Sequence, residues 1–354
     1  MRSKKLRKEL IFITIAWDPE DALLRHTLDW INESRKHFER VCVYATRVNL
    51  QISRETSPDI DIHEIGGGNA LKRLKGVVKL IVLSLRLLPK RKRYAVFYHM
   101  NVLPVLVMGV IVRLAGIPQG LWYSHKVAGL KLIVAEKLVN YCFSTSVNTF
   151  PLISTKVHEI GHGLGQSWEP KSDFSRRKNI ILVVGRVSRV KRIEDIILAN
   201  SRIMDKRPTI RLIGQIQDDK YLEEILTQAK NMKVAIEYAG ELNRDELKSE
   251  LAAGSIIYSG TKGSVDKAVL EGAISGCFLV SHNPSVYAAS GQGEVLSKEF
   301  HVNLAERSLE SQISFFLKIE GRVDIRKSIS KLSREKNSLS NLMKLIAYYL
   351  NDER

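Results

Sequence analysis

Short apolar segments with the composition of buried strands alternate with segments of helical periodicity along almost the whole chain. The first strand-like segment spans residues 10–16, a helical pattern follows over residues 21–38, and the next strand-like segment spans residues 41–46. Strict alternation of this kind predicts a parallel sheet covered by helices on both faces, because parallel strands need a crossover connection. We therefore expect an α/β fold.

The alternation is interrupted once, at residues 161–177, where Gly, Pro and charged residues replace the apolar pattern. It restarts with a strand-like segment at residues 179–184 and then continues. We expect two Rossmann-like domains, residues 1–163 and 164–333, facing each other across a cleft. Residues 334–354 carry apolar positions at the spacing of an amphipathic helix. We expect this C-terminal helix to pack back on the N-terminal domain.

The charge of the chain points to an anionic partner. Lys and Arg number 55 against 38 Asp and Glu, a formal net charge of +17, and no acidic residue lies between Glu64 and Glu136. Such an excess favours nucleic acid, a membrane surface or a phosphorylated ligand. Three well-separated cysteines favour a reducing compartment, and we identify no signal peptide or spanning helix. We expect a cytoplasmic protein that can lie at the inner face of the cell membrane.

Two loops carry residues suited to a nucleotide, and each follows a strand, where open α/β sheets bind their ligands. The first loop contains Gly185, Arg186 and Lys191 just before a helix. The glycine permits a tight turn, and two cations beside a helix N-terminus form a phosphate site. The alternative is a solvated basic turn without a ligand.

The second loop contains Ser264 and Asp266, either of which can cap the helix that follows. Glu271 lies one to two turns inside that helix, next to Leu270 and Ala273. A carboxylate among apolar residues is unusual on an amphipathic helix, so Glu271 is a candidate binding residue. The alternative is an exposed surface glutamate.

The two loops and the strand ends between them resemble a known family. The shared motifs are Gly185-Arg-Val-Ser-x-x-Lys191, Leu212-Ile-Gly214, Tyr238-Ala-Gly240-Glu241 and Leu270-Glu271-Gly-Ala-x-x-Gly276. They are similar to the donor domain of retaining glycosyltransferases of the GT-B fold, group 1 (family 4-like). The resemblance covers residues 179–284 well and the N-terminal half loosely.

This resemblance implies a role for each matched residue. Arg186 and Lys191 would hold the diphosphate of a nucleotide-sugar and stabilise it as it leaves. Glu271 would bind the ribose. The backbone near the base would be contributed by Gly240, Glu241 and Leu242.

One position departs from the family's pattern. Gly263 stands eight residues before Glu271, where the family usually carries a glutamate that contacts the sugar. The neighbouring Ser264, Asp266 and Lys267 are then candidates for contacts to the sugar or the phosphate. The identity of the sugar is not predicted.

In the N-terminal half, His99 and His125 each end a strand-like segment and resemble the two histidine-bearing strand ends of this family. The resemblance places His125 near the transferred sugar and the leaving phosphate, as a catalytic residue. His99, Asp18 and His162 are candidates for the acceptor side or the cleft. The alternative for a lone histidine is a structural role.

Aspartate pairs at residues 59 and 61 and at residues 218 and 219 could suggest a metal-bound nucleotide-sugar. Neither pair lies at a strand end with a second cluster of ligands. We expect no metal and no cofactor, since the nucleotide-diphosphate-sugar is a substrate.

The segment over residues 71–93 carries nine Lys and Arg and no acidic residue. Its apolar residues repeat at intervals of three and four, a stripe formed by Leu71, Leu74, Val78, Ile81, Leu85 and Leu88. Such a stripe predicts a helix packed on the sheet. The basic residues favour contact with anionic lipid, and both interpretations can hold together.

We therefore predict a metal-independent, retaining glycosyltransferase acting on a lipid-linked or envelope polysaccharide precursor. One alternative is a nucleotide-sugar epimerase of related fold, which needs no acceptor. Another is a basic nucleic-acid-binding protein, but basic and aromatic residues are not interleaved and no nucleic-acid-binding motif is present. We expect no nucleic-acid partner.

Overall fold

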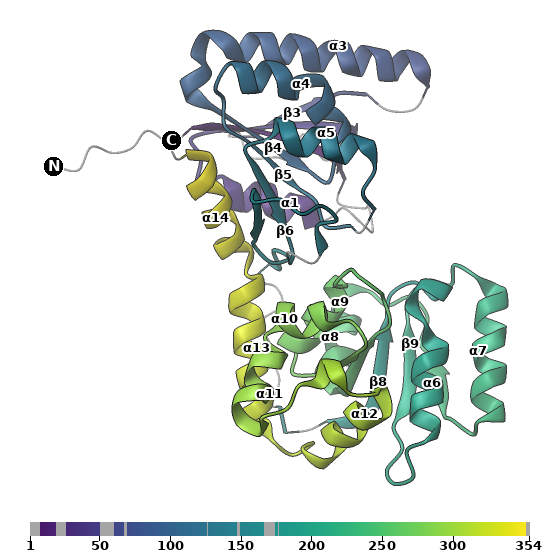
Figure 1. Ribbon diagram of the computed structural model, residues 1–354. Coiled ribbons are helices and arrows are strands. Elements are labelled where there is room, and N and C mark those ends of the chain that lie inside the picture. The colour runs from purple at the N-terminus through teal and green to yellow at the C-terminus, as the bar shows by residue number, and fades with distance from the viewer. Residues whose placement is uncertain are drawn as a thin grey trace. The chain divides into compact units, whose positions relative to one another are not determined.

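The chain folds into two compact units (Figure 1). Unit 1 comprises residues 1–165 and 339–354, and unit 2 comprises residues 166–338. The computed structural model describes residues 8–18, 26–49, 60–66, 69–125, 127–146, 149–165, 174–175 and 177–351. Asp59 and the start of the helix expected over residues 21–38 lie outside this part of the chain.

Unit 1 is built on a seven-stranded parallel sheet in the order β3-β2-β1-β4-β5-β6-β7. Its strands are β1 (Glu9–Trp17), β2 (Val41–Val48), β3 (Ile60–Glu64), β4 (Tyr94–His99), β5 (Gln119–Trp122), β6 (Tyr141–Ser144) and β7 (Val157–Glu159). The two edge strands, β3 and β7, were not predicted from the sequence. Both are short and contain charged residues, as edge strands commonly do.

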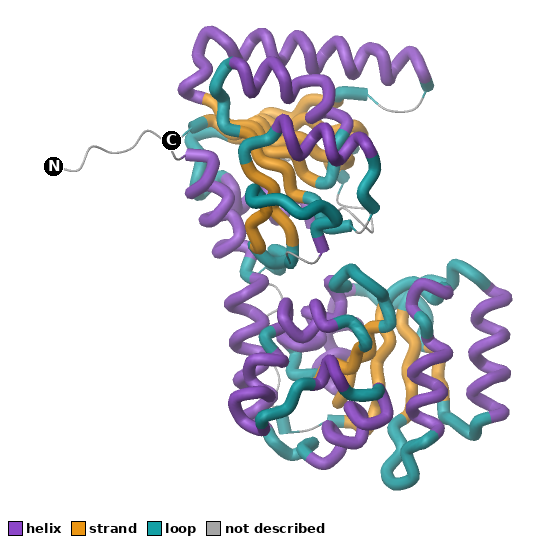
Figure 2. Tube along the Cα trace, in the orientation of Figure 1, coloured by secondary structure: helices purple, strands orange, loops and turns teal. Residues whose placement is uncertain are grey.

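Helices cover both faces of this sheet (Figure 2). One face carries α1 (His26–Ser34) and α14 (Leu339–Asn351), and the other carries α3 (Ala70–Leu87), α4 (Leu103–Leu114) and α5 (Leu130–Leu138). A 3₁₀ segment, η1 (Leu88–Arg93), follows α3. Side chains of β1 alternate between the two cores, because successive residues of a strand point to opposite faces.

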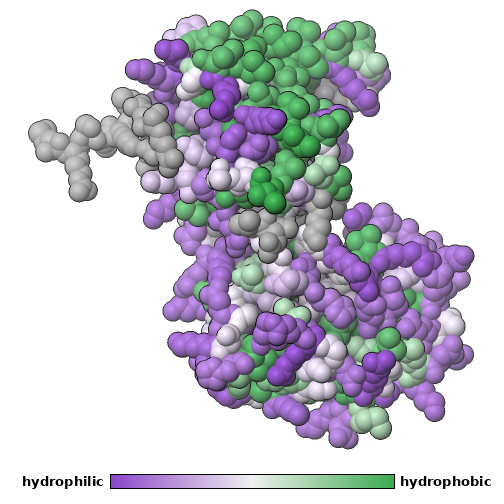
Figure 3. Space-filling model, in the orientation of Figure 1, coloured by the Kyte–Doolittle hydropathy of each residue, from purple (hydrophilic) through white to green (hydrophobic). Residues whose placement is uncertain are grey.

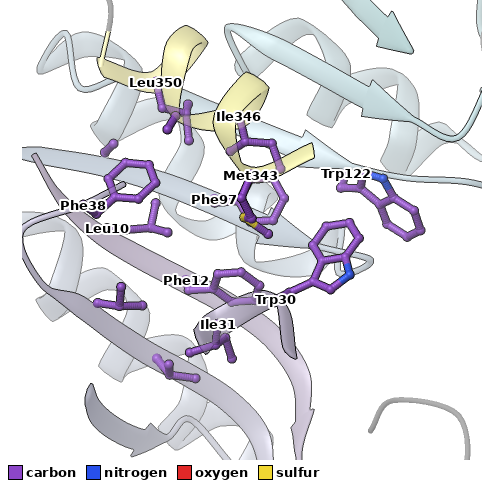
Figure 4. Packing of buried hydrophobic residues seen from close by; sticks show 14 of the residues in the cluster. Leu10, Phe12, Trp30, Ile31, Phe38, Phe97, Trp122, Met343, Ile346 and Leu350 are labelled. Atoms are coloured by element: carbon purple, nitrogen blue, oxygen red, sulfur yellow. The ribbon is translucent and has the colours of Figure 1, made fainter. Parts of the chain in front are cut away.

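The C-terminal segment is two helices rather than the single helix expected over residues 334–354. The first, α13 (Val323–Asn337), ends at Ser338, whose backbone is extended. The second, α14, starts at the next residue and belongs to unit 1. Met343, Ile346 and Leu350 point from α14 into the core that contains Phe97 (Figure 4).

Unit 2 is built on a five-stranded parallel sheet in the order β10-β9-β8-β11-β12. Its strands are β8 (Lys178–Val184), β9 (Thr209–Ile213), β10 (Ile236–Tyr238), β11 (Gly254–Ser259) and β12 (Phe278–Ser281). Its other helices are α6 (Ile193–Ser201), α7 (Asp219–Asn231), α8 (Arg244–Ala253), α9 (Lys267–Ile274), α10 (Pro284–Ser290), α11 (Gln292–Phe300) and α12 (Leu309–Lys318), with 3₁₀ turns η4 (Arg189–Lys191) and η5 (Leu304–Glu306).

The expected packing of α3 through its Leu71–Leu88 stripe is wrong. The buried residues of α3 lie on another side of the helix and are Gly76, Leu80, Leu83, Ser84 and Leu87. A Cβ atom on Gly76 would lie 2.1 Å from the Ile65 carbonyl oxygen, so this glycine lets the helix approach the end of β3 closely. The predicted stripe is exposed instead. None of the described helices combines the length and apolar character needed to cross a bilayer.

Candidate functional site

The sheet of unit 2 has its topological switch point between β8 and β11. The chain proceeds from β8 to β9 on one side and later adds β11 on the other side of β8. The loops that follow β8 and β11 therefore diverge from adjacent strand ends, which is where ligands of open parallel sheets bind. The two loops singled out in the sequence are these two.

The loop after β8 is held by glycines in close contact. The Gly185 amide donates a hydrogen bond of 2.8 Å to the Ile213 carbonyl, and its φ of 121° is accessible mainly to glycine. A Cβ atom on Gly214 would lie only 2.4 Å from the Gly185 carbonyl oxygen. The turn thus depends on Gly185 and Gly214 together.

Lys191 joins this loop to the loop after β11. Its Nζ lies 2.8 Å from Oδ2 of Asp266, and the Thr261 hydroxyl donates to the same oxygen at 2.8 Å. A Cβ atom on Gly260 would lie 2.0 Å from the Lys191 carbonyl oxygen, so the two backbones are in close contact. Only 16% of the Lys191 side chain is exposed. The ammonium group is consequently fixed at the switch point. One of its N–H groups donates to Asp266, and the others are available to a ligand.

Arg186 supplies a second cation in the same loop. Its side chain is exposed, and it forms no salt bridge with a residue in the described ranges. Ser264 and Lys267 are half-buried, at the start of α9 beside Asp266. Asp266 is the N-cap residue of α9, but its carboxylate makes no cap hydrogen bond and is directed to Lys191 instead.

Glu271 is a buried carboxylate on α9, with an exposed fraction of 5%. Its nearest cation is Lys267, whose Nζ lies 3.7 Å away. Burial raises the pKa of Glu271, while the charges of Lys267 and Arg244 act in the opposite direction. The alternative of an exposed surface glutamate is therefore wrong. A buried ionisable group is typical of functional sites, because burying a charge costs stability unless a ligand or partner uses it.

The end of β10 reaches the same edge of the sheet. The Gly214 amide donates a hydrogen bond of 2.8 Å to the Gly240 carbonyl, which ties the loop after β10 to the loop after β9. Gly240 has a φ of 78°, a turn conformation suited to glycine. Beyond it, Glu241 is exposed and Leu242 is half-buried.

Asn283 was missed by the sequence analysis. Its side-chain amide donates to the carbonyls of Thr261 at 3.2 Å and Ser264 at 3.0 Å, and so holds the loop after β11. That loop contains Gly263, which is buried with a φ of 96°. A glutamate at this position would adopt an unfavourable backbone conformation. The Asn283-Pro284 sequence indicates the start of a helix. It does not indicate that the Asn283 side chain turns toward the loop after β11.

The residues predicted in unit 1 fall into different environments. His99 is fully buried, with Nδ1 3.3 Å from the Thr14 hydroxyl and its ring stacked on Trp122. Asp18 follows β1 and accepts a hydrogen bond of 3.1 Å from the Asn49 side-chain amide. In this environment, His99 packs in the core of unit 1.

The other two histidines predicted as site residues in unit 1, His125 and His162, are more accessible. His125 lies after β5 with its ring edge-to-face against Tyr123, and partial desolvation of the ring lowers its pKa. The neutral imidazole is thus favoured at pH 7. His162 is half-buried and makes an edge-to-face contact with Trp122.

Asp61 and Asp218 have structural contacts where the sequence could have suggested metal binding, and Asp219 lies in the first turn of α7. Asp61 is paired with Arg40, and the Asp218 side chain accepts the Tyr221 amide at 2.9 Å as the N-cap of α7. Within the described ranges, no group of three or more His, Cys, Asp or Glu residues is placed to hold a metal ion.

No protein-family model matches the sequence, and no curated protein matches it. Among solved structures, the chain is similar to HepE from Anabaena in complex with UDP, at 14% identity over 96% of this chain and 98% of that one (TM-score 0.71). It is also similar to a glycosyltransferase from Rickettsia africae, at 13% identity over 97% and 98% (TM-score 0.69). A third is the lipopolysaccharide outer core galactosyltransferase WaaB in its apo form, at 12% identity over 96% and 99% (TM-score 0.69). The predicted α/β fold of two Rossmann-like domains, of GT-B type, is confirmed.

Proposed function

We propose that this chain is a glycosyltransferase that moves a sugar from a nucleotide-diphosphate-sugar to an acceptor with retention of configuration. The observation that carries the proposal is the arrangement at the switch point of unit 2. A fixed ammonium group (Lys191) and an exposed guanidinium (Arg186) share this edge of the sheet with the buried carboxylate of Glu271. Cations suit a diphosphate, and a carboxylate can accept hydrogen bonds from a ribose.

In this proposal the Asp266 carboxylate is a positioning group. It holds one donor of Lys191, which leaves the remaining N–H groups for the diphosphate. Lys267 and Ser264 at the start of α9 would supply further contacts to phosphate or sugar, whereas Gly263 offers the sugar no side chain. Gly240, Glu241 and Leu242 would contribute the backbone that meets the base.

The reaction needs charge stabilisation more than a protein nucleophile. The bond between the anomeric carbon and the diphosphate oxygen breaks, and the acceptor hydroxyl oxygen attacks the same face of the sugar. The hydroxyl proton passes to a diphosphate oxygen. Arg186 and Lys191 stabilise the negative charge that develops on the leaving group, typically the largest catalytic contribution. His125, held neutral by its lowered pKa, would hydrogen-bond the sugar or the leaving phosphate.

We further propose that catalysis needs no metal and that the acceptor is a lipid-linked or envelope polysaccharide precursor. Asp18 and His162 are candidate acceptor-side residues, whereas the buried His99 would act only through its neighbours.

The first experiment is calorimetric titration with UDP and UDP-glucose, the ligands of the HepE structures, beside the other nucleoside diphosphates. We expect one nucleoside diphosphate to bind clearly better than the rest, with and without EDTA. Binding of none of them would contradict the proposal. If transfer to an acceptor is then found, NMR of the product's anomeric proton tests retention.

A further inference from the structure

The outward side of α3 is apolar although nothing in the described structure packs on it. Leu71 and Leu74 are each 61% exposed, Val78 is 52% exposed and Leu85 is 51% exposed. These residues form the stripe that the sequence predicts to be buried. Burial of Gly76, Leu80, Leu83 and Leu87 uses another side of the helix, so α3 has two apolar sides and only one of them is covered.

The helix that packs beside α3, α4, and the helix that packs beside α4, α5, extend this apolar surface. On α4, Leu103, Val110 and Leu114 are 56%, 50% and 83% exposed. On α5, Leu130 and Val134 are 81% and 47% exposed. The three helices cover the same face of the sheet, and Figure 3 shows hydrophobic side chains gathered over α3 and α4. Contiguous apolar surfaces of this kind mark sites of interaction.

Basic residues flank the apolar surface. At 100° per residue, Lys72, Lys75, Lys79 and Arg86 fall on one side of α3, between its buried side and its outward apolar side. Lys90, Arg91 and Lys92 continue the series through η1, all of them exposed. Of these seven, none forms a salt bridge with a residue in the part of the chain that the structure describes. The cations are therefore available to an external anion.

A groove of about 500 Å³ runs between α3 and the β2–β3 edge, next to these cations. Its walls combine Lys79 and Arg86 with apolar side chains such as Val78 and Val82, and Glu64 also lines it. Lys79 donates to the Glu64 carbonyl at 2.8 Å. An amphiphilic groove of this kind suits a ligand with an anionic head and an apolar tail.

We propose that the outward face of α3, α4 and α5 docks on a lipid bilayer that contains anionic lipids. The exposed apolar residues of this face are aliphatic and would enter the hydrocarbon boundary, while the flanking cations meet the headgroups. A second copy of the chain fits less well, because its identical face would set cations against cations. A protein partner fits less well too, since the anchors of protein interfaces are enriched in aromatic residues.

The test is sedimentation of the whole chain with vesicles of phosphatidylcholine alone or mixed with phosphatidylglycerol, without nucleotide-sugar. We expect binding to the mixed vesicles that weakens as salt is added, because added ions screen surface charge. Lys72→Gln with Lys75→Gln should weaken binding by about fivefold for each cation removed. Leu74→Ser with Val78→Ser should weaken it by roughly tenfold.

Matched controls come from unit 2. Lys327→Gln with Lys331→Gln removes two exposed lysines from α13, and Met204→Ser removes an apolar residue that is 87% exposed. Both controls should bind vesicles like the wild type. Equal binding to the two vesicle types, or binding to neither, would overturn the proposal. So would a dimer in ultracentrifugation that the α3 variants dissociate. Because the vesicle assay contains no nucleotide-sugar, these outcomes do not depend on whether the protein transfers a sugar.

Discussion

Unit 2 and unit 1 use their basic residues in opposite ways. In unit 2, Lys191 is held by Asp266 at 2.8 Å, and the fully buried Arg326 donates to the carbonyls of Ser255 and Gly276. In unit 1, the cations of α3 are exposed beside an equally exposed apolar stripe. The net charge of +17 is therefore not one feature of the molecule. The Lys191 ammonium is held in one place by the fold and can help to define a site for one ligand, whereas the cations of α3 lie on an open surface and favour an extended anionic partner.

The largest expected effect tests this contrast with one substitution made in each unit. Arg326→Ala should lower the free energy of unfolding by about 3 kcal/mol or more, because it leaves buried carbonyls without a donor and exposes Phe278, over which the guanidinium lies at 3.9 Å. Arg86→Ala on α3 should change it by less than about 0.5 kcal/mol, since the side chain is exposed. Chemical denaturation measures both. If the two substitutions changed the free energy of unfolding equally, the proposed difference between the basic residues of the two units would be wrong.

The next effect concerns Glu271 and the ribose. Charge-assisted hydrogen bonds contribute roughly 1.5–3 kcal/mol each, so Glu271→Ala should weaken nucleoside diphosphate binding by about a hundredfold. Glu271→Gln keeps the size but loses the charge, and should weaken binding less. A 2′-deoxy nucleotide should bring the two variants closer together. Calorimetry with the preferred nucleotide measures these affinities. If Glu271→Ala binds the nucleotide as tightly as the wild type does, Glu271 does not contact the ribose.

A smaller effect is expected for the diphosphate. Removing one cation from a phosphate site costs about 1.5–3 kcal/mol, so Lys191→Ala and Arg186→Ala should each weaken binding of nucleoside diphosphate by about tenfold or more. Lys72→Ala in unit 1 is the control and should leave this affinity unchanged. A double-mutant cycle between Lys191→Ala and Asp266→Ala measures how much of the lysine's contribution depends on its positioning. If Lys191→Ala binds the diphosphate normally, the proposed site is wrong.

Much of the fold could be predicted from the sequence because its signal is local. Apolar runs such as residues 278–281 coincide with a buried strand, β12. The edge strands β3 and β7 were missed because their charged residues hide the strand pattern. The orientation of α3 could not be predicted either. A helix with apolar residues on two sides does not reveal which side is buried, and here the close contact between Gly76 and the end of β3 decides.

The site was predictable only in part. Glycine and charge motifs singled out Lys191 and Glu271, but the pairing of Lys191 with Asp266 joins residues 75 positions apart. That contact depends on the adjacency of β8 and β11, which no local pattern encodes. The same holds for Asn283 and Thr261, whose contacts fix the loop after β11.

The smallest expected effect is a pH dependence of stability that comes from Glu271. Burial raises its pKa in the folded protein, whereas in the unfolded chain the glutamate titrates at its ordinary value. At a pH below that ordinary value, Glu271 is protonated in both the folded and the unfolded protein, and it does not lower the free energy of unfolding. As pH rises toward the raised value, the unfolded chain loses its proton first, so the folded state loses stability relative to it. At a pH above the raised pKa the carboxylate is charged in both states, and the loss of stability no longer changes with pH.

Glu271→Gln removes this cost because glutamine does not titrate. We therefore expect Glu271→Gln to unfold like the wild type at acidic pH and to be more stable than the wild type at neutral pH, even though it binds nucleotide less well. Glu223→Gln, at an exposed position on α7, is the control and should match the wild type throughout. Thermal denaturation across this pH range measures the difference. A variant that is less stable at neutral pH would mean that the Glu271 carboxylate stabilises the free protein through Lys267 and Arg244. In that case the negative charge of Glu271 would stabilise the fold of unit 2, and it would not be a charge that is buried for the sake of a ligand.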